Sequence, residues 1–160
     1  MNSDWFLKNV IIAAEQYLPV KMSSPASRAM SLAIALQESR CKHRAQIGGP
    51  AKGYWQFEQG GGIRGVLTHP LSREHIRAVL TALDYGPDAD SAACYAAIQH
   101  NDALAACFAR LLLWTLPGAL PGKGDTQGGW DTYISAWRPG KPHRASWDAF
   151  YLEAWQKVED

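Results

Sequence analysis

Cysteine is scarce in this chain of 160 residues, which contains only Cys41, Cys94 and Cys107. Three thiols allow at most one disulfide, so the disulfide-rich class of small secreted domains is excluded. Their spacing lacks the paired C-x-x-C pattern of a zinc site, and the histidines lack the H-x-x-x-H spacing of a helical metal site. We therefore expect three buried, apolar thiols and neither a metal nor a cofactor.

The chain also lacks a large excess of positive or negative charge, because it has 16 basic and 15 acidic residues. A net charge of +1 argues against duplex nucleic acid and anionic membranes as principal partners. No apolar run reaches the roughly 18 residues that a membrane span needs. The first residues include Asp4 but no basic cluster, so we expect no secretory signal peptide, synthesis in the cytoplasm and no stable membrane insertion.

The chain does contain enough apolar sequence for one domain over residues 1–160, with 47% hydrophobic and 19% charged residues. Apolar residues at helical spacing, capping residues and terminating Pro or Gly predict a mainly α fold. The predicted helices cover residues 5–18, 26–41, 74–84, 91–99, 103–116, 129–137 and a last segment capped by Ser146. The other predicted caps are Ser24, Asp90 and either Asn101 or Asp102.

Glycine is concentrated in one segment, since seven of the 14 glycines lie between Gly48 and Gly65. Together with Pro50 and Pro70, they predict a shaped loop over residues 43–70. The aromatic stretch Tyr54–Phe57 within it favours a small β-hairpin. A second loop rich in Gly and Pro is predicted over residues 116–129.

Glu38 is the first candidate for chemistry. The apolar stripe of the helix over residues 26–41, continued by four positions from Ile34, arrives at Glu38 just before the glycine-rich segment. Desolvation there raises the pKa of a carboxyl group, and a carboxylic acid that stays protonated is what cleavage of a glycosidic bond requires. The alternative is a structural Glu satisfied by Arg40, Arg44 or a backbone amide.

Two motifs resemble the lysozyme superfamily, in particular its branch of soluble lytic transglycosylases and goose-type lysozymes. They are Ala35-Leu-Gln-Glu38-Ser39-Arg40 and Gly53-Tyr54-Trp55-Gln56-Phe57, within a resemblance covering residues 25–142. The resemblance implies an α+β lysozyme-like fold in which Glu38 is the catalytic acid. It also implies that Ser39, Gly53 and Gln56 are the motif residues beside the cleft.

The chain departs from this family further on. Where the family has Tyr-Asn-x-Gly, this sequence has Trp137-Arg138-Pro139-Gly140, a form similar to phage-encoded members. The place of the family's tyrosine on the catalytic side falls to Tyr133 or Trp137.

Glu58 is the second candidate carboxylate, since it follows the Gln56-Phe57 pair and precedes three glycines. If the carboxyl groups of Glu58 and Glu38 face each other across a cleft at roughly 6.5–9.5 Å, Glu58 can activate a water molecule. A separation of about 5 Å between the two carboxyl groups favours a covalent intermediate instead. A transglycosylase needs only Glu38, with the sugar's own 6-hydroxyl as nucleophile. A solvated loop charge is the remaining interpretation of Glu58.

Polar and aromatic residues near these acids suit an acetylated sugar. Gln56 and Ser39 can bind amide and hydroxyl groups, or satisfy only the backbone. Tyr54 and Trp55 can stack on sugar faces, or pack in the core. A basic cluster near the C-terminus, formed by Arg138, Lys141, His143 and Arg144, is either a solvated turn or a contact for peptide or lactyl carboxylates.

The sequence therefore predicts a helical, lysozyme-like domain whose cleft lies between the Glu38 helix and the glycine-rich segment. We expect it to cleave the β-1,4 bond between N-acetylmuramic acid and N-acetylglucosamine in peptidoglycan strands. A phage or prophage source, synthesis in the host cytoplasm and action on the cell wall are expected, with other virion or lysis proteins as possible partners. The alternatives are a non-catalytic phage structural or glycan-binding module and a chitinase-like lysozyme.

Overall fold

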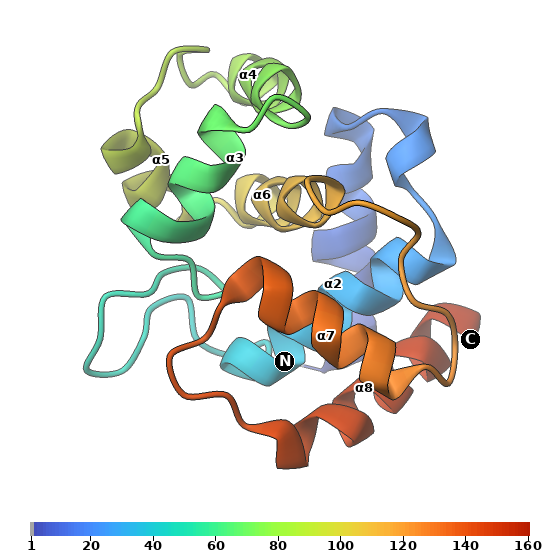
Figure 1. The fold of residues 1–160 in the computed structure, drawn as a ribbon. Helices are drawn as coiled ribbons and strands as arrows, with labels where there is room; N and C mark the ends of the chain where they lie inside the picture. The colour runs from blue at the N-terminus through green and yellow to red at the C-terminus, as the bar shows by residue number, and fades with distance from the viewer. Residues whose placement is uncertain (1) are drawn as a thin grey trace.

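Residues 2–160 are described by a computed structural model, which is mainly helical (Figure 1). The chain opens with α1 (Ser3–Phe6), which continues as the π-helical turns η1 (Leu7–Ile12), and with two short 3-10 turns, η2 (Glu15–Tyr17) and η3 (Val20–Met22). The remaining helices are α2 (Pro25–Ser39), η4 (Gln59–Ile63), α3 (Arg64–Thr68), α4 (Arg73–Ala82), α5 (Ser91–Ile98), α6 (Asp102–Trp114), α7 (Thr126–Trp137) and α8 (Arg144–Glu159).

Three of the predicted helix starts are confirmed by their caps. Ser24 and Ser27 form a reciprocal capping box at the start of α2, with each hydroxyl accepting the other residue's backbone N–H at 3.0 Å. The carboxylate of Asp90 accepts from Ala93 N at 2.8 Å, and the side chain of Asn101 accepts from Leu104 N at 3.0 Å. These interactions satisfy backbone N–H groups that a helix leaves free in its first turn.

Two predicted starts are wrong. α7 begins at Thr126 rather than Gly129, because Asp125 caps it by accepting from Gly128 N at 2.9 Å. α8 begins at Arg144, so Ser146 lies inside its first turn and is not its cap. The helix predicted over residues 5–18 is a continuous helical run from Ser3 to Tyr17, whose hydrogen bonding changes from α in α1 to π in η1 and 3-10 in η2.

The glycine-rich segment differs most from the prediction. Its second half, residues 59–68, is helical rather than a loop, and only Gly61 departs from helical backbone angles within it. The predicted β-hairpin is reduced to an isolated bridge in which Lys52 and Phe57 exchange two backbone hydrogen bonds of 2.8 Å. Within residues 2–160 the structure has isolated β-bridges but no sheet.

The buried side chains form one core that draws on residues from Phe6 to Trp155. α2 and α6 supply much of it, since residues 29–36 of α2 and most of α6 are buried. α2 packs along α8, while α6 contacts α4, α5 and α7 (Figure 1). The three cysteines are free and buried, which confirms the sequence interpretation. This packing fixes the end of α2 against the helices and turns that surround Glu38.

Gly62 lies where the packing leaves no room for a side chain. A Cβ at Gly62 would lie 2.7 Å from Phe57 Cδ1 and 3.3 Å from Leu112 Cδ2, whereas one at Gly60 would meet nothing within 4 Å. We expect Gly62→Ala to lower the free energy of unfolding by about 1–3 kcal/mol through overpacking. Gly60→Ala, the matched control in the same element, is expected to leave it unchanged or slightly higher. Urea unfolding of both variants checks this, and equal stabilities would show that Phe57 moves freely.

Candidate active site

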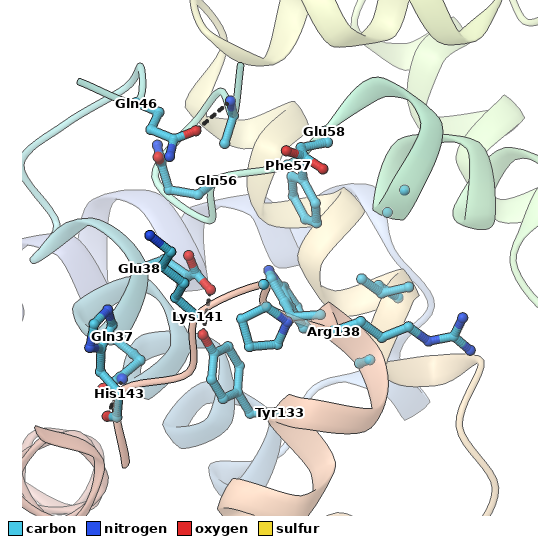
Figure 2. A pocket seen from close by; sticks show the side chains of 18 of the residues that line it. Gln37, Glu38, Gln46, Gln56, Phe57, Glu58, Tyr133, Arg138, Lys141 and His143 are labelled. Atoms are coloured by element: carbon cyan, nitrogen blue, oxygen red, sulfur yellow. Dashed lines mark hydrogen bonds between the residues drawn. The ribbon is translucent and has the colours of Figure 1, made fainter. Parts of the chain in front are cut away.

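A cleft of about 610 Å³ lies at the C-terminal end of α2. One wall is formed by the segment of residues 43–62, and the opposite wall by α7 and the loop of residues 138–143. Figure 2 shows Gln56 and Glu58 on the first wall, facing Glu38 and Tyr133 across the opening. The glycine-rich segment thus forms one wall and Glu38 reaches the cleft from the end of α2, while α7 and the following loop, which the sequence does not predict as a wall, form the other.

The position of Glu38 follows from the way α2 ends. Arg40 and Cys41 adopt left-handed backbone conformations, with φ of 57° and 55°, so the chain turns away directly after Ser39. The Ser39 hydroxyl lies 2.6 Å from Tyr54 O and 3.1 Å from Ala35 O, and its donated bond ties this helix end to the next motif. Glu38 is thereby held in the last turn of a helix whose preceding turns are buried.

The surroundings of Glu38 raise the pKa of its carboxyl group. Burial raises the pKa of its carboxyl above the ordinary value of 4.5, and the hydrogen bond from Tyr133 partly opposes that rise. Tyr133 Oη donates to Glu38 Oε1 at 2.5 Å (Figure 2). The surroundings of Glu38 thus favour its neutral form more than water does.

The two arginines that a purely structural Glu38 would pair with are engaged elsewhere. Arg40 donates to the carbonyl of Leu36 and lies over the ring of Phe150. Arg44 instead forms a two-bond ion pair with Asp102, with both distances 2.9 Å. Neither guanidinium neutralises Glu38, so the carboxyl remains available to a ligand in the cleft.

Tyr133 is fixed by aromatic packing. Its ring stacks on Trp147 with a centroid distance of 5.2 Å and an interplanar angle of 8°. Burial and the neighbouring Glu38 raise the pKa of the Tyr133 phenol, so it remains a donor. Trp137, the other candidate for this place, donates its indole N–H to Trp55 O at 2.9 Å and stacks on Phe57. Both line the cleft, but only Tyr133 bonds to Glu38.

Four predicted substrate contacts are located inside the protein instead. Trp55 is fully buried and donates its indole N–H to Ser31 O at 2.8 Å. Tyr54 is 1% exposed and packs edge-on against Phe6. Ser39 is buried by its backbone contacts, and Gly53 is buried at a φ of 76°. The tight turn of residues 53–56 directs Tyr54 and Trp55 into the core, and Ser39 at the end of α2 is buried beside them, so these groups support the cleft and do not line it.

Gln56 and Glu58 do line the cleft, as the sequence predicts. Gln56 has a φ of 54°, and its amide nitrogen donates to Gly53 O at 2.9 Å. Glu58 is exposed, directly before η4. These two residues thus contribute one amide and one carboxylate to this wall.

Sequence reasoning missed other polar groups in the cleft, notably Gln37 and Gln46. Gln46 accepts from Ala51 N at 3.0 Å, which shapes the loop beside it. Gln37 joins α2 to the start of α8, because its amide donates to His143 O at 2.8 Å and accepts from Ser146 Oγ at 2.9 Å. The proximity of Gln37 to Glu38 in sequence was the available signal, whereas its partners are more than one hundred residues away.

Among residues 2–160, no three His, Cys, Asp or Glu side chains gather as metal ligands would. None of the helices in this part of the chain has the length and apolar character needed to cross a bilayer. Comparisons with models of known protein families, with curated proteins and with solved structures find no match for this chain.

Proposed function

We propose that this protein cleaves the β-1,4 bond between N-acetylmuramic acid and N-acetylglucosamine in peptidoglycan, with Glu38 as the general acid. The observation that supports it most is the desolvated Glu38 carboxyl in an open cleft, held by Tyr133 and free of ion pairs in the described structure. An exposed Glu38 without a groove would have favoured the alternative, a non-catalytic binding module. The resemblance of the two motifs to lytic transglycosylases adds the substrate class.

In the proposed reaction, the protonated Glu38 gives its proton to the glycosidic oxygen as the bond from C1 to that oxygen breaks. In hydrolysis, water then attacks C1 and its proton passes to a carboxylate, for which Glu58 is the candidate. In transglycosylation, the 6-hydroxyl of the same sugar attacks C1 and Glu38 takes its proton, which leaves a 1,6-anhydro ring. Neither route requires a cofactor.

Mass spectrometry of fragments released from purified sacculi tests the proposal and separates the two routes. Reducing ends indicate hydrolysis, and 1,6-anhydro ends indicate transglycosylation. If the protein hydrolyses the bond with Glu58 as the base, Glu58→Gln should slow the release of fragments by about 10²–10⁴-fold. If it is a transglycosylase that uses Glu38 alone, the same variant should slow that release by less than about tenfold. Intact sacculi after prolonged incubation would contradict the proposal and favour the binding module.

The proposal also covers the setting of the reaction. The phage-like Trp137-Arg138-Pro139-Gly140 form favours an endolysin or a virion-borne enzyme that reaches the cell wall at lysis or at infection. Other virion or lysis proteins are then its proposed partners.

Tyr133→Phe should separate positioning from acid chemistry. The Tyr133 hydrogen bond lowers the pKa of Glu38, so its removal should raise that pKa further. Because the general acid acts in its protonated form, we expect the alkaline limb of the pH profile of kcat/KM to move to higher pH, together with a lower maximal rate. The pH dependence of sacculus cleavage measures this. An unshifted limb would show that the hydrogen bond is unimportant to the proton of Glu38.

A further inference from the structure

Two positively charged side chains without an ion-pair partner in residues 2–160 border the same cleft. Arg138 and Lys141 line it from the loop of residues 138–143, and both are exposed. Within residues 2–160 neither belongs to an ion pair, whereas Arg44, a few residues after Glu38, is paired with Asp102. In the view of Figure 2 the two side chains extend from the loop in opposite directions. The loop thus offers two separated positive charges to a ligand.

This loop is anchored at both ends. At its start, Trp137 donates to Trp55 O at 2.9 Å, and Arg138 ends α7 in a left-handed conformation with a φ of 48°. At its end, the Gln37 amide donates to His143 O at 2.8 Å. Pro139 and Pro142, between these anchors, restrict the backbone further. Cations on a restrained loop lose less conformational entropy on binding than cations on a mobile one.

The acids of the cleft do not cancel this charge. The described lining contains two carboxyl groups, those of Glu38 and Glu58. Glu38 forms no ion pair with Arg138 or Lys141 within residues 2–160, and Glu58 lies on the opposite wall. The wall that carries Arg138 and Lys141 is therefore positive, and it complements a ligand that bears carboxylates along its length.

We propose that Arg138 and Lys141 determine specificity by binding carboxylates of the glycan strand, so that the cleft prefers anionic strands to neutral polymers of N-acetylglucosamine. This inference rests on the proposed function, because it names how that site selects its substrate. The carboxylates have two sources with the same chemistry: the lactyl groups of strands without peptides, and the acidic side groups of attached stem peptides.

The test measures binding on the Glu38→Gln background, so that cleavage does not consume the ligands. Calorimetric titration compares three hexasaccharides: a peptide-bearing strand, a strand stripped of peptide by an amidase, and neutral hexa-N-acetylglucosamine. We expect both anionic ligands to bind more tightly than the neutral one, with a preference that declines as salt increases. Tighter binding of the stripped strand identifies lactyl carboxylates, and tighter binding of the peptide-bearing strand identifies those of the peptide.

The double variant R138Q/K141Q then assigns the preference to this loop. We expect its affinity for anionic hexasaccharides to fall by about tenfold, which brings the ratio of anionic to neutral dissociation constants close to one. The control R73Q/K157Q removes two charges that lie outside the cleft lining and should keep the wild-type ratio.

The outcomes separate the two proposals. Equal binding of neutral and anionic ligands, or a preference that survives R138Q/K141Q, overturns the specificity inference even where sacculi are cleaved. Anionic preference that depends on these cations, in a protein that cleaves no glycan, supports the binding inference and overturns the proposed activity. Absence of both binding and cleavage overturns both.

Discussion

Glu38→Gln is expected to reduce the release of fragments from purified peptidoglycan by about 10²–10⁴-fold, the range that general acid catalysis contributes. Glutamine keeps the shape of Glu38 and can accept the Tyr133 hydrogen bond, but it has no proton to give to the leaving oxygen. The matched control is Glu74→Gln, which removes an exposed carboxylate on α4 and should retain wild-type activity. An active Glu38→Gln variant would show that Glu38 is not the acid.

The pH dependence of unfolding shows independently whether Glu38 is desolvated. Because its pKa is higher in the folded state than the ordinary 4.5, the folded protein holds this proton while the unfolded chain releases it. Wild-type stability should therefore fall, relative to Glu38→Gln, as the pH rises from below 4.5 through the raised pKa. The two proteins should differ least at low pH, where both side chains are uncharged. Denaturant unfolding across this pH range measures the difference.

The elements that could be predicted from sequence are those whose signals are local. The capping box of Ser24 and the cap of Asn101 lie within three residues of the N–H groups that they satisfy, so the pattern is visible in the chain. The helical turns over residues 59–68 lack such a signal, because three consecutive glycines disfavour a helix. Burial of Ile63 and Val66, together with the close approach of Gly62 to Phe57, outweighs that propensity.

The candidate site divides in the same way. The sequence indicates Glu38 because this residue continues an apolar stripe and lies in a segment that resembles a known motif. Its bond to Tyr133 joins residues 95 positions apart, which no local pattern reveals. The sequence also does not indicate that the side chains of Tyr54 and Trp55 point into the core. Their direction depends on the left-handed conformations of Gly53 and Gln56 on either side of them. Aromatic residues beside a predicted cleft therefore carry little information about which of them face a ligand.

Trp55 provides the second large effect, and it concerns stability. The indole is fully buried, packs on Phe6 and donates to Ser31 O, while its carbonyl accepts from Trp137. We expect Trp55→Ala to lower the free energy of unfolding by about 3–5 kcal/mol, because it leaves a cavity where α1, α2 and the turn meet. Trp5→Ala, which removes a tryptophan that is 46% exposed, should cost less than about 1 kcal/mol.

The milder Trp55→Phe variant keeps the test decisive if the alanine variant does not fold. It retains most of the packing but loses the indole bond to Ser31 O, whose carbonyl keeps its bond within α2, so the expected loss is about 0.5–1.5 kcal/mol. Titration of this folded variant with N-acetylglucosamine oligomers should give wild-type affinity, because Trp55 lies beneath the cleft and does not line it. The cleft tryptophan is Trp137, so ligand-induced fluorescence changes should persist in Trp55→Phe. If Trp55→Phe instead binds the sugar weakly and has unchanged stability, Trp55 contacts the ligand, which would mean that the turn opens in solution.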